Sequence, residues 1–293
     1  MSRKRGEVAA TDLDASTSRL TGPVKPLVPE SADPREVKLR RLRGHLKDAA
    51  ELAGFDLSEL SRRLGDRLGR RPRLLDLFCG GGGAGQGYHL AGFDVTGVDI
   101  EDRPSYPFQF IKGDALKVSL KGYDAVHASP PCQRYSRTRT IRREIPDSRY
   151  QDLLDAARRR LTDWGGVWVI ENVATAPMGA RREGTAHHCI LLCGTQFGLK
   201  CYRHRLFESN EMLFAPPHYP HRKRTVTRKD DILADPDAML MPAGHFPCYD
   251  RHAAAMGIDW GMTRDELAEA IPPAFTRFLG GQLVNILLTK GQR

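Results

Sequence analysis

The feature that most constrains the fold of this chain is an alternation of short apolar runs and helically spaced segments that begins at Arg73. Apolar runs of strand length occupy residues 74–78, 95–100, 125–128 and 167–170. Helical spacing follows the first run at 85–90, precedes the fourth at 150–164 and returns at 265–288. The alternation predicts an α/β fold with an open, mostly parallel sheet, whose ligands gather at the carboxyl ends of the strands.

Length and composition indicate a protein outside the membrane. A chain of 293 residues suits one domain with a small appendage, and no apolar run is long enough to cross a bilayer. The basic N-terminus leads into a polar stretch rather than an apolar signal core, so we expect a cytoplasmic protein, in a prokaryotic cell or a phage-infected host. Six scattered cysteines fit a reducing compartment. The net charge of +9 favours a polyanionic partner, the alternative being a basic surface that only aids solubility.

Composition divides the chain into five segments. We expect a disordered arm at 1–34, a helical extension at 35–71, the main domain at 72–208, a small inserted module at 209–261 and a segment returning to the main domain at 262–293. Within the extension, residues 49–64 resemble a helix-turn-helix with its turn at Gly54, so that polar residues from Ser58 to Arg63 would face a major groove. A plain helical extension is the other interpretation.

A glycine-rich turn, Asp-Leu-Phe-Cys-Gly-Gly-Gly-Gly-Ala-Gly at 76–85, follows the first apolar run. Glycines let the backbone turn tightly and approach a cofactor, and the following helix start supplies N–H groups. Asp99 ends the next run, where a carboxylate commonly accepts ribose hydroxyls, and Asp114 would lie near an adenine amino group. The alternative for each aspartate is a helix cap or a solvated loop residue.

Cys132 is the candidate nucleophile. It follows Pro130 and Pro131 after the third apolar run, so its backbone is stiff and its sulfur is held in position. The reactive thiolate needs a lowered pKa, which the arginines at 134, 137 and 139 could provide; these arginines could instead hold substrate phosphates. The alternative is a buried structural cysteine.

Glu171 is the candidate proton donor. It ends the fourth apolar run and is expected to reach the crevice that holds Cys132. An apolar crevice raises the pKa of a carboxyl group, which can then donate a proton near neutral pH. A nucleophilic thiol together with a proton-donating carboxyl group is typical of an enzyme that adds its sulfur to a conjugated ring. The alternative is an ion pair between this glutamate and an arginine.

Together these motifs resemble those of the DNA cytosine-5 methyltransferase family, in a short form, over about 74–207 and again over 271–288. The glycine-rich turn resembles the family's S-adenosylmethionine motif, and residues 130–136 resemble its nucleophile loop. Residues 171–173 resemble its glutamate motif, and 197–207 its arginine motif. The late Ile-Pro-Pro and its following helix resemble the segment that completes the cofactor pocket.

The resemblance implies a Rossmann-like S-adenosylmethionine-dependent methyltransferase that methylates carbon five of a cytosine flipped out of duplex DNA. It implies catalytic roles for Cys132, Glu171, Arg203 and Arg205, with a covalent cysteine adduct. It implies cofactor contacts from Phe78, Gly80, Gly82, Gly83, Asp99, Ile100, Asp114 and Pro131. Residues 209–261 would be a target-recognition module, and we expect a monomer.

Three departures from the family pattern stand out. Cys201 occupies the position where the family usually has glutamine before the first arginine. The stretch between Asp99 and Asp114 is short, so the usual helix there is expected to be cut down. The recognition module is small, which favours a short or loose target sequence.

The module contains a basic cluster at 221–224 suited to phosphate contact, or equally to a solvated surface. The histidines at 187 and 188, with cysteines 189, 193 and 201, invite a zinc interpretation, but the apolar run around them favours core packing, so we expect no metal.

Two other functions stay open. An RNA cytosine-5 methyltransferase would use the same chemistry on a structured RNA, with RNA as the less favoured partner. A DNA-binding regulator with an inactive methyltransferase domain is suggested by the helix-turn-helix pattern, although an intact set of catalytic residues argues against it.

Overall fold

The computed structural model describes residues 56–135, 152–179 and 187–290. Within them a seven-stranded sheet has the order β3-β2-β1-β4-β5-β7-β6. The strands are β1 (Arg73–Leu77), β2 (Asp94–Asp99), β3 (Gln109–Lys112), β4 (Ala125–Ala128), β5 (Val167–Val173), β6 (His188–Leu192) and β7 (Arg205–Ser209). The first five strands are parallel, and β7 runs antiparallel to both of its neighbours. The predicted mostly parallel α/β sheet is confirmed.

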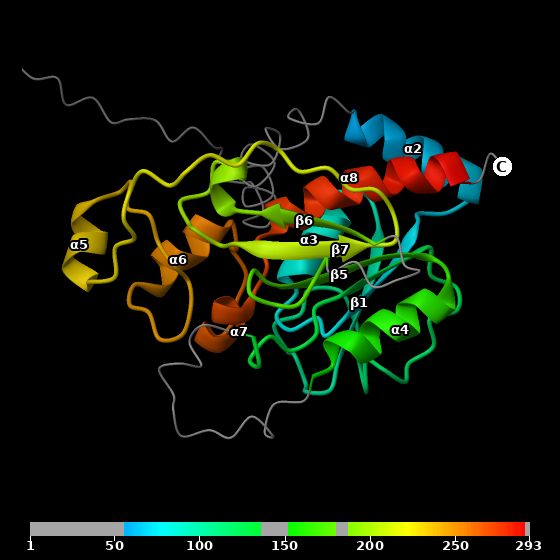
Figure 1. Ribbon diagram of the computed structural model, residues 1–293, viewed down its shortest axis with the longest axis horizontal. Coiled ribbons are helices and arrows are strands. Elements are labelled where there is room, and N and C mark those ends of the chain that lie inside the picture. Colours follow the sequence, from blue (N-terminus) through cyan, green and yellow to red (C-terminus); the bar gives the residue numbers. More distant parts are fainter. Residues whose placement is uncertain (1–55, 136–151, 180–186, 291–293) are drawn as a thin grey trace, which may run out of the picture. The chain divides into compact units, whose positions relative to one another are not determined.

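The central strands are buried on both faces, which explains why the sequence shows continuous apolar runs there rather than alternation. Every residue of β4 is buried, as are the last four of β1 and the first six of β5. Figure 1 shows α4 (Leu154–Trp164) on one side of the sheet and α8 (Pro273–Lys290) with α2 (Leu57–Leu68) on the other. Each side therefore has its own apolar core.

The core on the α8 side joins α2, α3 (Gly83–Leu90) and α8 to the sheet. Most residues of α8 are buried, because this helix lies against two helices as well as the strands. The hydroxyl of Thr276 in α8 donates to the carbonyl of Ala84 in α3 at 2.8 Å. A Cβ at Gly87 would lie 2.0 Å from the hydroxyl oxygen of Thr276, so only glycine permits this close helix packing.

The N-terminal extension is described only from residue 56. Asp56 caps α2 by accepting from the Glu59 N–H at 3.1 Å, and the helix buries Leu57 and Leu64 against the main domain. The arm at 1–34, the rest of the extension and the proposed turn at Gly54 lie outside the described residues. The described part is a plain helix packed on α8, with Arg62 paired to Glu59 and Asp66 along its exposed side.

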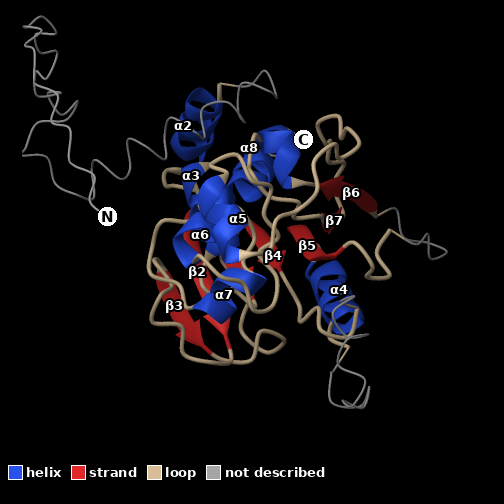
Figure 2. Cartoon of the chain, turned by 90° about the vertical axis from the view of Figure 1, so that its left-hand side faces the viewer, coloured by secondary structure: helices blue, strands red, loops and turns tan. Residues whose placement is uncertain are grey.

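A third apolar cluster contains residues of the predicted module together with Cys201 before it and Met262 to Ala270 after it. Three short helices belong to this region, α5 (Lys229–Ala234), α6 (Tyr249–Met256) and α7 (Arg264–Glu269). Figure 2 shows the three close together in front of the sheet. The module boundaries at 209 and 261 stay a prediction.

Two details of the sequence prediction are wrong. The fourth apolar run continues as strand to Val173, so Glu171 lies inside β5 and does not end it. The helical spacing predicted at 265–288 is two helices, because Ile271 and Pro272 interrupt it. As expected, no helix stands between β2 and β3, a stretch that lies wholly within the described residues. In the described ranges, no helix has the length and apolar character needed to span a membrane.

Candidate active site

The site forms where the carboxyl ends of three adjacent strands meet. Leu77 of β1 pairs with Ala128 of β4, and Ala128 pairs with Ile170 of β5. The glycine-rich turn, the Cys132 loop and Glu171 each follow directly from these paired positions. The parallel register therefore brings three motifs that are far apart in sequence to one edge of the sheet.

Backbone and amide hydrogen bonds fix the Cys132 loop to its neighbours. The Ser129 N–H donates to the Leu77 carbonyl at 3.1 Å, and the Asn172 side-chain amide donates to the Pro130 carbonyl at 2.9 Å. The Tyr135 N–H closes a turn by donating to the Cys132 carbonyl at 2.9 Å. Asn172, next to Glu171, thus holds the Cys132 loop against the strand that carries the candidate acid.

Burial raises the pKa of the half-buried Cys132 thiol, although Arg205 and Arg203 oppose this shift. The sequence interpretation required a lowered pKa, so its direction is wrong for the described structure, because desolvation outweighs the neighbouring cations. The cations that act on the sulfur come from the strand region at 203–205. Arginines 137 and 139 lie outside the described residues.

Glu171 is buried and faces Arg205. Nε of Arg205 lies 2.9 Å from Oε1 of Glu171, and the Ser129 hydroxyl also bonds this carboxyl. Burial nevertheless raises the pKa of Glu171, because desolvation exceeds the stabilisation by the arginine. The predicted direction is confirmed, and the alternative of an ion pair with an arginine is also present.

Arg203 has buried hydrogen-bond donors that are not used. Nη1 donates to the Pro242 carbonyl at 2.5 Å, while Nε and Nη2 have no partner among the described residues. Burial and the charge of Arg205 lower the pKa of Arg203 to about 9, with Glu171 and Cys132 opposing the shift. A buried guanidinium with two unmet N–H groups is costly unless a ligand accepts from it.

The glycine-rich turn gives its opening residues an unusual backbone. Phe78 and Gly80 have positive φ angles of 59° and 49°. A Cβ at Gly80 would meet no described atom within 4 Å, so this side of the turn is open. The Gly80 N–H donates to Asp99 at 3.1 Å, and Ile100 beside it is 70% exposed. An open turn, a carboxylate and an exposed apolar side chain thus adjoin one another.

Three other residues that the sequence predicts to contact the cofactor pack against or bond to other parts of the protein. A Cβ at Gly82 would lie 2.7 Å from Pro107, and one at Gly83 would lie 2.3 Å from the Ile271 carbonyl, so close packing demands these two glycines. Asp114 accepts from the Leu116 N–H at 2.9 Å and pairs with Lys117, which is the loop-cap alternative. Pro131 is exposed. The cofactor contacts of these residues stay predictions.

Sequence reasoning missed two residues that shape the cofactor side. Asp76 is fully buried, its Oδ1 has no partner in the described ranges, and burial raises its pKa strongly. The indole N–H of Trp260 donates to the Gly81 carbonyl at 2.9 Å, which ties residue 260 to the glycine-rich turn. The position of Asp76 inside the motif was a usable signal, whereas nothing in the sequence pointed to Trp260.

No protein-family model and no curated protein sequence matches the chain. Solved structures that resemble it include a protein described as a DNA modification methyltransferase encoded within an E. coli prophage, with a TM-score of 0.51 and 14% identity. Others are the Entamoeba histolytica methyltransferase EhMeth (TM-score 0.48, 13% identity) and the S. pombe Dnmt2 methyltransferase (TM-score 0.47, 14% identity). Each match covers 74% of this chain and 99% of the other.

The first of these likenesses, with a TM-score above 0.5, is a likeness of fold. The chain therefore has the Rossmann-like fold of S-adenosylmethionine-dependent methyltransferases, as the sequence predicted.

Proposed function

We propose that the protein is a DNA cytosine-5 methyltransferase that uses S-adenosylmethionine. The observation that carries the proposal is that Cys132, Glu171 and Arg203 interact electrostatically beyond paired positions of β4 and β5, while two buried donor atoms of Arg203 have no partner among the described residues. A thiol, a carboxyl with a raised pKa and a guanidinium with free N–H groups are the three functions needed to activate a pyrimidine ring. The likeness to a DNA modification methyltransferase supports the same class.

The residues at the ends of β1 and β2 fit the cofactor. The open side of Gly80, the Asp99 carboxylate and the exposed Ile100 provide a close backbone approach, a hydroxyl acceptor and an apolar surface for a flat ring. The bound cofactor supplies a methyl group on a positively charged sulfur. Asp76, with a buried oxygen that lacks a described partner, lies beneath this turn and helps to fix its backbone.

Cys132 begins the reaction by forming a bond from its sulfur to carbon six of the flipped cytosine, and its proton leaves to solvent. The electron pair of the broken ring double bond shifts toward carbon five, and Glu171 donates its proton to the ring nitrogen at position three. Carbon five is then nucleophilic and can accept a methyl group. Water then takes the proton from carbon five, and the electron pair of that bond re-forms the double bond between carbons five and six. The sulfur leaves carbon six as a thiolate, and the nitrogen proton returns to Glu171.

The two arginines have different parts in this proposal. Arg205 holds the Glu171 carboxyl in place through the contact at 2.9 Å. Arg203 donates through Nε and Nη2 to the ring carbonyl oxygen, which satisfies both buried groups and stabilises negative charge that develops there.

Nucleic acid is the substrate that the charge favours. The chain carries a net charge of +9, and residues 222–224 present three exposed basic side chains. Because stacking hides both faces of a base, the target cytosine must leave the duplex before Cys132 can reach it.

The test is methyl transfer by the purified full-length chain from labelled S-adenosylmethionine, with duplex DNA and transfer RNA offered in competition. We expect label in DNA, and mass analysis of the digested product identifies 5-methylcytosine. Transfer only to RNA would support the RNA alternative, and label on another atom or no transfer at all would contradict the proposal. Cys248→Ser serves as the matched control, because Cys248 is a half-buried free cysteine that precedes α6 and is not among the candidate catalytic residues.

A further inference from the structure

A second cluster of reactive side chains lies beside the candidate active site. Cys193, His204, His218 and His221 each offer one ligand atom, and these four atoms all lie within 4.8 Å of one another. Cys193 directly follows β6, His204 directly precedes β7, and the two other histidines lie in the segment after β7. The cluster thus joins three separate stretches of chain.

The spacing of the four atoms suits a tetrahedral metal ion. The Cys193 sulfur lies 3.4 Å from Nε2 of His221, and Nε2 of His218 lies 3.1 Å from the same nitrogen. Zinc bonds of about 2.0–2.1 Å to nitrogen and 2.3 Å to sulfur place neighbouring ligand atoms roughly 3.3–3.7 Å apart. One thiolate with three imidazoles is a donor set that zinc prefers.

The surrounding residues hold the ligands in place. The Tyr202 ring stacks on His221 with centroids 3.7 Å apart and planes 7° apart. The Gln196 side chain accepts from the Cys193 N–H at 2.6 Å and donates to the Pro216 carbonyl at 2.5 Å, so one amide links two ligand-bearing segments. Thr195 donates its hydroxyl to the Cys193 sulfur at 3.4 Å. Such outer contacts are typical of metal ligands.

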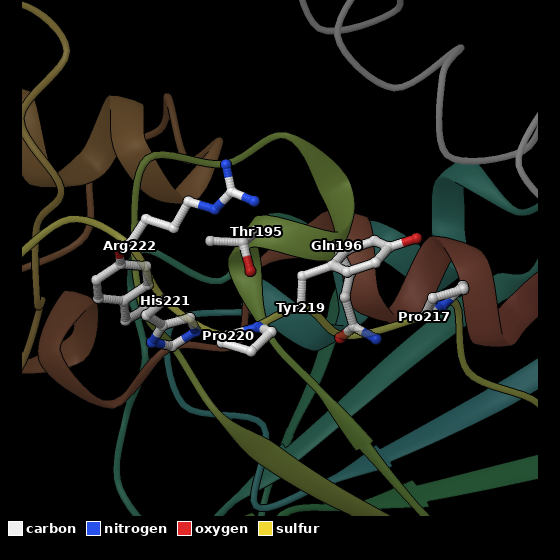
Figure 3. Close-up of a pocket in the computed structure, with 8 residues that line it drawn as sticks. Thr195, Gln196, Pro217, Tyr219, Pro220, His221 and Arg222 are labelled. Atoms are coloured by element: carbon white, nitrogen blue, oxygen red, sulfur yellow. The ribbon is translucent and has the colours of Figure 1, made fainter.

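A pocket borders the cluster, lined by Thr195, Gln196, Tyr202, Pro217, Tyr219, Pro220, His221 and Arg222. Figure 3 shows His221 beside Pro220 among the residues that line this pocket. The pocket lies against the histidine cluster, and none of the candidate catalytic residues lines it. It gives a metal ion a way in from solvent past the two exposed histidines.

We propose that these four side chains bind one zinc ion in a Cys-His₃ site. Four protein ligands fill a tetrahedral shell, so the site is structural rather than catalytic. From the sequence we expect no metal, and of the histidines and cysteines at 187–201 that invite a zinc interpretation only Cys193 belongs to this cluster. Cys201 is buried in the third apolar cluster, and the three new histidines come together only through the fold.

A zinc ion at this site would fix the positions of the chain segments that carry its ligands. His204 stands between Arg203 and Arg205, so a bond from its ring to zinc fixes the backbone that carries both arginines. His218 and His221 attach the segment with basic residues 222–224 to the end of the sheet. Zinc would therefore hold the candidate catalytic strand and the candidate nucleic-acid contacts in one arrangement.

The experiment measures metal content rather than activity, so its result is independent of the proposed function. The untagged full-length chain is expressed with zinc, dialysed against metal-free buffer and analysed by plasma mass spectrometry. We expect about one zinc per chain. The double variant His218→Ala/His221→Ala should lose the metal, while the controls His245→Ala and Cys248→Ser should keep it, because these residues lie outside the cluster.

Cobalt substitution reports on the sulfur ligand. The cobalt form of the wild-type chain should show a thiolate-to-metal absorption band, which Cys193→Ser should lack. Circular dichroism of each variant establishes that it is folded, and a chelator should lower the melting temperature of the wild-type chain and of the two control variants but not that of the double variant. Wild-type protein with less than about a tenth of an equivalent of zinc would overturn the proposal. So would full zinc retention in the folded double variant.

Discussion

Each face of the β5–β7 strand pair carries a buried glutamate, but the pKa values of the two carboxyl groups shift in opposite directions. Glu171 pairs in register with Phe207, and Glu208 pairs with Ile170, so the two glutamates point to opposite faces of the sheet. Both carboxyls are buried, and both contact an arginine. Yet folding raises the pKa of Glu171 and lowers that of Glu208.

The difference lies in how completely each carboxylate is satisfied. Arg158 of α4 donates to both oxygens of Glu208, at 2.6 and 2.9 Å, and the Gly179 N–H and His187 add two further contacts. Glu171 has one arginine contact at 2.9 Å and the Ser129 hydroxyl, which do not repay its desolvation. Glu208 is thus a structural anion, whereas Glu171 is suited to carry a proton, and pairs of carboxyls with separated pKa values mark this division of roles.

The largest expected effect is the loss of methyl transfer when Cys132, the proposed nucleophile beside Glu171, is replaced. Cys132→Ala should lower methyl transfer by at least about 10⁴-fold, because no other group can form the bond to carbon six. Binding to duplex DNA, measured by mobility shift, should be retained. Methyl transfer close to the wild-type rate would contradict the assignment, with Cys248→Ser as the thiol control.

Replacing each of the two glutamates with glutamine compares the two faces of the sheet directly. Glu171→Gln should lower kcat by about 10²- to 10⁴-fold, because the amide cannot donate and recover the ring proton. Glu208→Gln should instead lower the free energy of unfolding by about 3 kcal/mol, because Arg158 loses its charged partner in a buried site. Steady-state kinetics per folded molecule and urea unfolding measure the two quantities. If the two variants gave the same pattern, the two faces would not differ in role.

Variants of Arg203 and Arg205 should affect turnover to different extents. Arg203→Gln removes donors aimed at the substrate and should lower kcat by about 10²-fold. Arg205→Lys keeps a cation beside Glu171 and should cost less, with its effect concentrated in the pH profile of turnover. A larger loss for the lysine variant would exchange the roles proposed for these arginines.

The pH dependence of stability should have opposite signs at the two glutamates. The pKa of Glu208 is lowered, so its contribution is present above the unfolded-state pKa near 4.5 and is lost as pH falls through the folded-state value. The pKa of Glu171 is raised, so the stability from its protonated form is lost as pH rises from near 4.5 to the folded-state value. Urea unfolding of both glutamine variants across this range measures the difference from wild type. Curves of equal sign would contradict the comparison.

The smallest expected effect is on the cofactor side. Ile100→Ala removes part of an exposed apolar surface and should raise the Kd for S-adenosylmethionine about 10-fold, or about 1.4 kcal/mol. Isothermal titration calorimetry measures it, and Ile111→Ala is the control, because Ile111 is also exposed but lies within β3. Equal effects in both variants would remove Ile100 from the site.

The parallel half of the sheet could be predicted from sequence because its information is local. The strands β1, β2, β4 and β5 are apolar runs, and the motif after each, such as Gly80 or Cys132, lies at the same edge by parallel register. The edge strand β3, Gln-Phe-Ile-Lys, is mostly exposed and is not such a run. The antiparallel strands β6 and β7 and the region after them could not be predicted in this way. The contacts of Trp260 with Gly81, and of His221 with Cys193, join residues with no shared sequence pattern.

The sequence predicted the direction of the pKa shift correctly for Glu171 but not for Cys132, because only the first depends on the local sequence. The raised pKa of Glu171 follows from burial in an apolar strand, which a sequence reveals. The shift at Cys132 depends on the balance between burial and arginines that approach from residues 203 and 205, which the sequence places far away. Of the predicted cations, Arg137 and Arg139 lie outside the described residues.

The most direct test of the central claim is to trap the bond between Cys132 and the base. Duplex DNA with fluorine at position five of the target cytosine cannot lose a proton there after methyl transfer, so the sulfur should stay attached to carbon six. With S-adenosylmethionine present, we expect a covalent complex whose digest gives a modified peptide containing Cys132, and no complex with Cys132→Ala. Methylation of unmodified DNA together with no adduct, or an adduct on a different residue, would contradict the account.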